Sequence, residues 1–417
     1  MSRPALPGRR RLTAAELDLI VSAHGRLVAG QPGGKRASLP FVDFSGLDLS
    51  GRELSGADLR GSVFDGAKLA GCRLVAANLA GCDLRGADLR GAVLVKADLR
   101  GACLQGANLT DADLSEVDLR PGKVAMPHPS KGFPAVVEEP RSGEVDRANL
   151  TGASLDGSRL DGLYAQGTDF SDCSFKGASL LDANLKGASL SGALLEKTAL
   201  SGANLEGADL QGAVLAGTPL EAAKTAGAKL DRMLAAPNRA ELSRAQQLLV
   251  AIRGHDQWVR TGGKQGGRAV LDGEDLRPLA EELKGLRLTA ISAKQAILVG
   301  VDLSTTELQG ADLEGADLRG ACLREADLRG AKLSGANLTK AELSAALFSP
   351  LPLGAGRSTP TNLTAARMRS ATASRADFTG ALMAEADLKG CDLSGAKLAA
   401  VELSANQRRA SRGLAPA

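Results

Sequence analysis

The feature that most constrains this chain is a repeat of five residues. A leucine or phenylalanine marks each repeat from Leu39 to Leu119, from Leu150 to Leu230 and, with more exceptions, from Leu283 to Leu403. On an α-helix, successive markers would be separated by about 140° and would circle the helix. On a flat strand they would fall on alternate faces. The period therefore predicts short extended segments joined by a corner in every repeat.

The other positions of the repeat agree with this prediction. The residue two places before the marker is small, as at Ala57 and Cys72, and shares the inward face of the marker. The residue between them is often Asp or Asn, as at Asp58, and points outward. Glycine follows two places after the marker, as at Gly61, where a corner requires a positive φ. Aromatic residues make up only 2% of the chain, so the core must be narrow and filled by Leu and Ala.

This pattern, A-(D/N)-L-x-G, resembles that of the pentapeptide-repeat family over most of the chain. The resemblance implies an all-β fold, a right-handed quadrilateral β-helix with four pentapeptides in each coil. Coils would then stack at about 4.8 Å, each residue on the one four repeats later. We therefore expect Phe44 to stack on Phe64, and an outward ladder of Asp58, Asn78, Asp98 and Asp118.

Two stretches without the repeat predict helices that cap the solenoid. Thr13 with Glu16, and Asn238 with Glu241, form capping boxes that begin amphipathic segments. Each segment ends in a similar motif, His24 to Val28 and His255 to Val259, and leads into a Gly-rich stretch. A helix over the end of a solenoid covers unpaired strand edges and core leucines. We predict cap contacts by four residues: His24, Leu27, His255 and Trp258.

A third stretch, residues 121–146, is rich in proline and is predicted to be a loop that is neither helix nor strand. The repeat frame shifts by one residue across it, which indicates an insertion between coils. A partner-binding role is predicted for His128, Lys131 and Phe133 in this loop. Residues 349–361 are also rich in Pro and Gly, but the frame continues, which predicts an irregular bulge.

These patterns divide the chain into seven segments. They are an N-terminal tail, capping helix and Gly-rich connection (1–38), a first solenoid array (39–120), the Pro-rich inserted loop (121–146), a second array (147–234), a second capping helix and Gly-rich connection (235–270), a third array (271–405) and a basic C-terminal tail (406–417).

The sequence predicts no catalytic residue, no cofactor and no metal site. Its three histidines do not combine with a nucleophile in any recognisable motif, and the six cysteines include no CxxC pair. Gly30 to Lys35 resembles a phosphate-binding loop but is one residue short and lacks the following Ser or Thr. The sequence shows no apolar run long enough to span a membrane and no secretory signal, so the expected location is the cytoplasm.

The expected function is a non-enzymatic protein-interaction or scaffold module whose partner and oligomeric state the sequence does not define. The net charge of +3 argues against nucleic-acid binding. The family resemblance implies an alternative, a DNA mimic that binds a type II topoisomerase such as gyrase. A mimic requires a strongly acidic face, whereas each array has at most three more acidic than basic residues.

Overall fold

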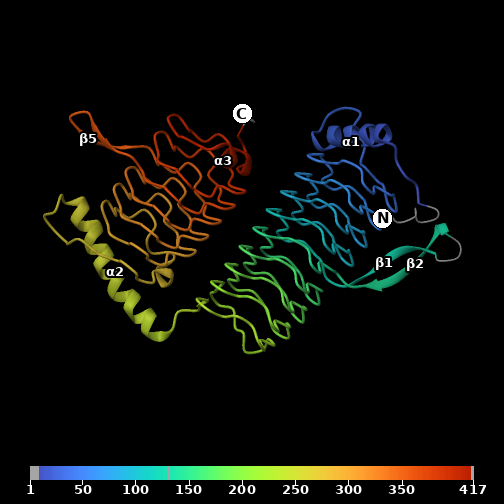
Figure 1. Cartoon of the computed structure of the whole chain (residues 1–417), viewed down its shortest axis with the longest axis horizontal. Coiled ribbons are helices and arrows are strands. Elements are labelled where there is room, and N and C mark those ends of the chain that lie inside the picture. The colour runs from blue at the N-terminus through green and yellow to red at the C-terminus, as the bar shows by residue number, and fades with distance from the viewer. Residues whose placement is uncertain (1–8, 129–131, 415–417) are drawn as a thin grey trace. The chain divides into compact units, whose positions relative to one another are not determined.

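The structure is a computed structural model that describes residues 9–128 and 132–414, without the side chains of residues 124–137. The chain forms two compact units, Met1–Ala236 and Pro237–Ala417. Each unit is a stack of coils with helical segments and one inserted hairpin (Figure 1). No helix among the described residues is long and apolar enough to cross a membrane.

The coils are held together by parallel pairing between residues 20 positions apart. Asp58 pairs with both Ser38 and Asn78, and three further ladders of the same kind run along unit 1. The Leu59 N–H donates to Asn78 O at 2.9 Å, and the Gly61 N–H at the next corner donates to Ala80 O at 2.8 Å. Four such pairs per coil, each followed by a corner, define a β-helix solenoid, as the five-residue period predicts.

The corners require a left-handed backbone. Gly61 has a φ of 62°, and glycine occupies most equivalent positions. Where another residue replaces it, as at Lys96, the backbone keeps a φ of 61°. The corner geometry is therefore set by the coil, and glycine is the residue that adopts it with the least strain.

The core is a narrow column of the marker residues and the small residues beside them. Leu59, Leu74 and Ala77 are fully or almost fully buried. Phe44 and Phe64 stack with ring centroids 4.6 Å apart and an interplanar angle of 7°, as expected from their spacing. Burial of each leucine contributes roughly 1.5–3 kcal/mol, and the sum over neighbouring coils stabilises a solenoid that has no broad core.

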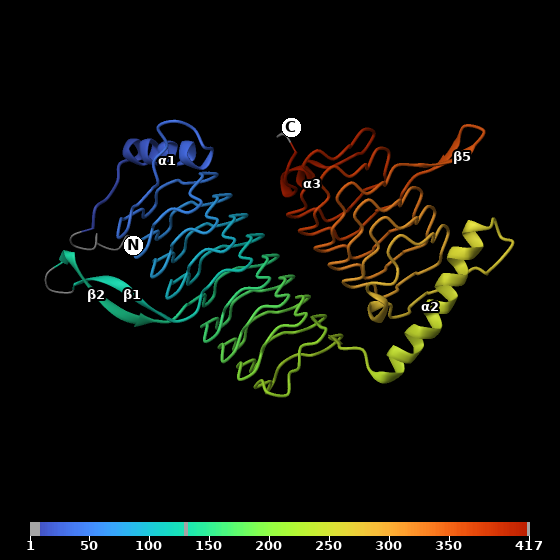
Figure 2. The same cartoon turned by 180° about the vertical axis from the view of Figure 1, so that it is seen from behind.

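Unit 1 begins with helix α1 (Ala14–Val28), which covers the first coils. Strands β1 (Gly122–His128) and β2 (Gly132–Arg141) form an antiparallel hairpin that extends from the side of the stack (Figures 1 and 2). Strands β3 (Val214–Leu215) and β4 (Leu234–Ala235) are a parallel pair in the last two coils. The prediction that residues 121–146 contain no strand is therefore wrong.

Unit 2 begins with helix α2 (Arg239–Arg260), followed by the 3-10 helix η1 (Arg277–Leu279). Strands β5 (Leu351–Gly354) and β6 (Arg357–Thr359) form a second, shorter antiparallel hairpin where the sequence predicts an irregular bulge. Asn362 pairs with Lys332, 30 positions away, so this insertion adds ten residues and keeps the repeat frame.

The C-terminal segment differs from the predicted tail. Helix α3 (Ala405–Ala410) lies against the last coil of unit 2. The Gln407 side-chain amide donates to Met383 O and Ala386 O, both at 2.9 Å, and Arg412 pairs with Asp392. The segment satisfies backbone acceptors at the end of the solenoid, and its basic composition did not reveal this role.

Candidate functional site

The hairpin β1–β2 leaves unit 1 at a corner between two walls of the coil. Asp118 precedes it and pairs with Arg159, 21 positions farther along the chain than the regular spacing. Glu144 follows it and resumes the pairing with Cys103 below and Tyr164 above. The 21 inserted residues leave the stacking of the coils intact, because only a corner is extended. Because 21 residues are four repeats of five plus one, the insertion shifts the repeat frame by one residue, as the sequence shows.

The foot of the hairpin is fixed by close packing. A Cβ on Gly143 would overlap the carbonyl oxygen and side chain of Leu119. A Cβ on Gly122 would lie 3.1 Å from Arg100 Cβ, and one on Gly162 would lie 3.3 Å from Pro121 Cγ. The chain therefore leaves and rejoins the wall in tight contact with it. The hairpin is attached to a rigid support at both ends.

Two prolines of the hairpin, Pro127 and Pro140, are compatible with strands because of their positions in the register. Pro140 faces Lys123 and Pro127 faces Val136, two pairs of the same parity in the ladder. Proline has no N–H, so both pairs must be those whose nitrogens point away from the partner strand. Both prolines thus remove a donor from an outer edge, which is where strands accept proline. The proline content indicated a loop, but it protects the edges of a hairpin from further pairing.

Of the residues predicted to bind a partner here, Lys131 lies outside the described residues. His128 is the last residue of β1 and Phe133 lies in β2, but their side chains lie outside the description as well. Their role stays a prediction. The residues from 124 to 137 include Val, Ala, Met, Phe and Pro and only one formal charge, at Lys131. This part of the hairpin is therefore apolar, in contrast to the charged walls of the coils.

Two exposed apolar residues near this foot were not predicted as site residues. Tyr164 pairs with Glu144 on the wall that β2 rejoins and is 48% exposed. Leu181 lies on the wall that leads to β1, where its carbonyl accepts from the Gly162 N–H at 2.8 Å, and is 38% exposed. Each is an apolar residue at an outward position of the repeat, and that departure from the pattern was visible in the sequence.

The predicted cap contact of His24 is a hydrogen-bonded latch. The ring is buried, its Nδ1 accepts from the Ala37 N–H at 3.1 Å and its Nε2 lies 3.0 Å from Ser55 O. Because Nδ1 accepts, the proton of the neutral ring is on Nε2, which donates to Ser55 O. One side chain thus joins helix α1 to two backbone groups of the solenoid, at Ala37 and at Ser55.

His255 forms the same latch in unit 2. Its Nδ1 accepts from the Ala269 N–H at 3.1 Å and its Nε2 donates to Thr289 O at 3.0 Å. Burial, the largest cause, lowers the pKa of His255; Arg268 lowers it further, whereas the hydrogen bond to Thr289 and the charge of Asp256 oppose the shift. The neutral form of His255 is therefore favoured, and the latch requires this form because Nδ1 must accept a hydrogen bond.

The other two predicted cap residues behave differently. Leu27 is 44% exposed and is not among the buried residues of α1, so the prediction that it packs in the cap is wrong. Gly34 comes into contact with the backbone of Leu27 instead, so backbone and not the leucine side chain closes this end of the helix. Trp258 is half-buried, with its ring 5.6 Å from that of His255 and 5.8 Å from Arg268 Cζ.

The outward ladders consist largely of charges that are already paired. Arg90 donates from Nε and Nη2 to both carboxylate oxygens of Asp88, at 2.8 and 2.6 Å, and Arg100 binds Asp98 in the same way. The hydrogen bond from Arg90 lowers the pKa of Asp88. Asp58, Asn78, Asp98 and Asp118 do form one ladder, as predicted. The pairing of Arg with Asp on these walls makes them electrically balanced.

Side chains suited to metal binding do not converge in the described part of the chain. No three His, Cys, Asp or Glu residues there could hold a metal ion. Burial raises the pKa of Cys72 and of Cys82 to about 12, so these thiols behave as small apolar side chains. Cys103, half-buried beside Glu144, also has its pKa raised, to about 11, mainly by burial.

Fold and surface together define a class, a β-helix solenoid with paired outward charges and inserted hairpins. The family model for pentapeptide repeats (8 copies) matches residues 43–79, 72–115, 146–182, 178–217, 287–324, 311–349 and 361–398. These matches cover more than half of the chain, and the chain therefore belongs to the pentapeptide-repeat family.

Several solved structures are similar to the chain. Trypsin-treated QnrB1, a plasmid-mediated fluoroquinolone resistance protein, is 17% identical, with 51% of this chain and 97% of that chain covered and a TM-score of 0.32. HetL, involved in heterocyst differentiation regulation in the cyanobacterium Nostoc sp. strain PCC 7120, is 25% identical, with 80% and 96% covered and a TM-score of 0.21. Rfr23 from the cyanobacterium Cyanothece 51142 is 28% identical, with 31% and 90% covered and a TM-score of 0.23. No protein with a curated description matches the chain.

Proposed function

We propose that this chain is a non-enzymatic scaffold that binds a protein partner through the hairpin β1–β2. The observation that carries the proposal is a hairpin that is apolar over residues 124–137 and held rigidly at the foot, on a solenoid whose outward charges are largely paired. A preorganised apolar element loses little entropy on binding and gains from desolvation. The proline-protected edges favour binding through the faces of the hairpin over strand addition.

The remaining features of the proposal follow from the same fold. The solenoid is a right-handed quadrilateral β-helix, as the family and the four pairs per coil suggest. The buried cysteines with raised pKa are consistent with a structural role in a reducing cytoplasm. His24 and His255 act as structural latches, because each is saturated by backbone partners and is not available to a substrate.

A hairpin deletion tests this function. Residues 123–140 are replaced by two glycines in the full chain, and a matched variant replaces residues 351–359 of the second hairpin in the same way. Affinity purification with quantitative mass spectrometry should lose a reproducible partner with the first variant only. If every partner is retained after deletion of 123–140, the hairpin is not the binding element and the proposal is wrong.

A DNA mimic that binds a topoisomerase is the second candidate, because a projecting hairpin is a feature that the family resemblance connects with this role. The paired Arg and Asp ladders argue against it, since they cancel the negative charge that DNA would present. A supercoiling assay with purified gyrase decides the matter. Inhibition at micromolar protein that is lost with the 123–140 deletion would replace the scaffold proposal with the mimic.

A further inference from the structure

Large exposed apolar side chains have a restricted distribution among the described residues. Some lie on the helices, and Leu230 and Val270 lie at the last and first coils of their units, where the solenoid ends. All the others lie near an inserted hairpin. In unit 2 these are Leu347, Leu353 and Leu382, which are 36%, 54% and 48% exposed. Single exposed leucines are common on proteins, but their concentration around hairpins on otherwise polar walls is not explained by chance exposure.

The three leucines of unit 2 surround the hairpin β5–β6. Leu347 lies on the wall that leads into β5, between Asp327 and Asp377 in its ladder. Leu382 lies on the wall that β6 rejoins, where its N–H donates to Thr361 O at 2.9 Å. Leu353 lies in β5 itself. The hairpin thus carries one exposed leucine and has another beside each of its two ends.

The hairpin is held firmly where it leaves the coil. Leu351 packs on the corner below, and a Cβ on Gly330 would lie 2.6 Å from Leu351 Cβ. Pro350 packs on the corner above, with Cγ 3.1 Å from a Cβ placed on Gly380. The Thr361 hydroxyl accepts from the Gly330 N–H at 2.9 Å and donates to Leu328 O at 3.0 Å. The glycine corners therefore form a seat, and the hairpin is preorganised.

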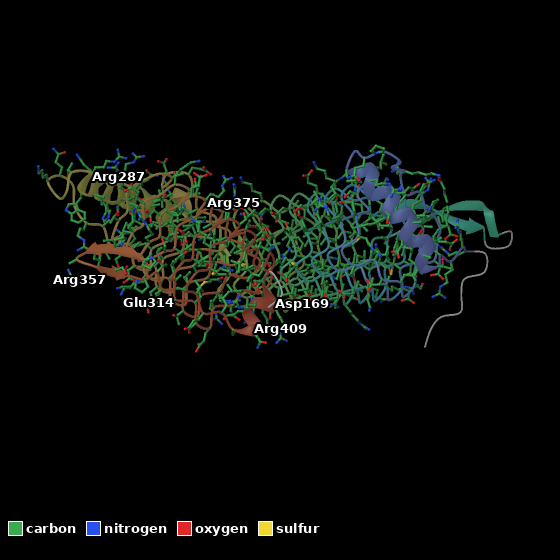
Figure 3. The ribbon with its side chains drawn as sticks, turned by 90° about the horizontal axis from the view of Figure 1, so that it is seen from above. Asp169, Arg287, Glu314, Arg357, Arg375 and Arg409 are labelled. Carbon is green, nitrogen blue, oxygen red and sulfur yellow. The ribbon has the colours of Figure 1, made fainter. Side chains whose placement is uncertain are left out.

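One unpaired cation accompanies these leucines. Arg357, at the start of β6, is exposed and forms no ion pair with any described residue (Figure 3). Two cations on the adjacent walls are paired, Arg329 with Asp327 at 2.6 Å and Lys332 with Asp312 at 3.1 Å. Arg357, on the hairpin itself, is therefore a charge that is available to attract a partner. An arginine binds a carboxylate through two parallel hydrogen bonds, so a carboxylate is the complementary group.

We propose that β5–β6 and the leucines around it bind a segment of a protein partner that carries an aliphatic or aromatic side chain beside a carboxylate. The apolar side chain is desolvated against Leu353 and one of the flanking leucines, and the carboxylate pairs with Arg357. Leucine and arginine in this arrangement combine burial with a directional charge-assisted contact, as at the centres of protein interfaces. The proposal concerns unit 2 alone and does not depend on the role of β1–β2.

The test selects phage-displayed random peptides, about 16 residues long, on the purified full chain. Selected peptides are synthesised with fluorescein, and their Kd is measured by fluorescence anisotropy. They should contain an aliphatic or aromatic residue near Asp or Glu. Leu353→Asp and Arg357→Glu should each weaken binding at least about tenfold, whereas Leu230→Asp, at an exposed leucine of unit 1, should not. Thermal melts by circular dichroism identify any variant that fails to fold.

A charge exchange provides the second measurement. A peptide whose carboxylate is replaced by lysine should bind Arg357→Glu more tightly than the native chain. The proposal is wrong if the selected peptides bind the Leu353→Asp and Arg357→Glu variants as tightly as the native chain, or if no peptide is enriched. It is also wrong if sedimentation shows a dimer that Leu353→Asp converts to a monomer, because the surface would then bind a second copy. The 123–140 deletion should leave peptide binding unchanged, which separates this result from the function proposed for β1–β2.

Discussion

The two units of the chain share one design and differ in their insertions. Each begins with a capping box, a helix, a histidine latch and a Gly-rich connection, and His24 and His255 bind equivalent backbone groups. Unit 1 carries 21 inserted residues at one corner and unit 2 carries ten at another. The two units therefore share the capping helix and its histidine latch, whereas their corners accept insertions of different length.

The two units also differ in how their last coils are covered. In unit 2, Gln407 of α3 binds backbone carbonyls of the last coil. In unit 1, the last coil leaves Leu230 40% exposed, and Leu220 and Met233 are only partly buried. A solenoid transmits no strain far along its axis, because each coil contacts only its neighbours. The two units can therefore differ at one end and still be alike at the other.

The largest expected effect distinguishes the foot of one hairpin from the tip of the other. Gly143→Ala should destabilise unit 1 by about 3 kcal/mol or more, because the new Cβ overlaps the Leu119 backbone. Gly354→Ala, at the exposed tip of the other hairpin with open space around it, should cost only about 1 kcal/mol through its φ of 81°. Urea denaturation followed by circular dichroism measures both. Equal losses would show that the foot is not rigid.

The second prediction concerns the latches. His255→Ala should lower the stability of unit 2 by about 2–4 kcal/mol, because the Ala269 N–H and Thr289 O lose their partner in a buried site. His24→Ala should do the same to unit 1. The single tryptophan, Trp258, lies in unit 2, so its fluorescence should report the His255 change and not the His24 change. A shift of the fluorescence transition by His24→Ala would contradict independent units.

A smaller effect is expected from acid. The pKa of His255 is lowered in the folded unit, so the unfolded chain binds the proton more readily. The stabilisation is therefore complete above the unfolded pKa, about 6.5, and is lost as pH falls below that value toward the folded pKa. Denaturation followed by Trp258 fluorescence at pH 7.5 and at lower pH should show this loss. His255→Gln should remove most of the dependence, and an unchanged slope would assign it to other groups.

The smallest effect compares two Arg–Asp pairs of the ladders. Arg319 is nearly buried in unit 2, with 8% of its side chain exposed, whereas Arg90 in unit 1 is 59% exposed. Arg319→Ala should cost about 1–3 kcal/mol, because Asp317 loses a partner in a partly desolvated site. Arg90→Ala should cost less than about 1 kcal/mol, as expected for a surface pair. Urea midpoints at low and high salt should separate the two, with Arg90 the more sensitive to salt.

The sequence predicted much of the fold but less of the surfaces. The marker residues and the small inward residues followed from the period, because local geometry repeats in every coil. The stacking of Phe44 on Phe64 followed from the four-repeat coil that the family resemblance implies. Proline counts misassigned residues 121–146, since the effect of a proline depends on whether its nitrogen faces a partner strand. Leu27 was placed in the cap by helical spacing, but the returning backbone at Gly34 occupies that end of the helix.

What the sequence determined by itself is the repeating unit of the solenoid: a period of five places every marker residue on the axis and every corner at the same interval. Only the tertiary structure decided which backbone groups the capping side chains bind and which residues stand out from the walls. His24 meets Ser55, Gln407 meets Met383, and Leu382 borders a hairpin that begins 31 residues before it. These contacts join positions far apart in the chain, and no local pattern specifies them.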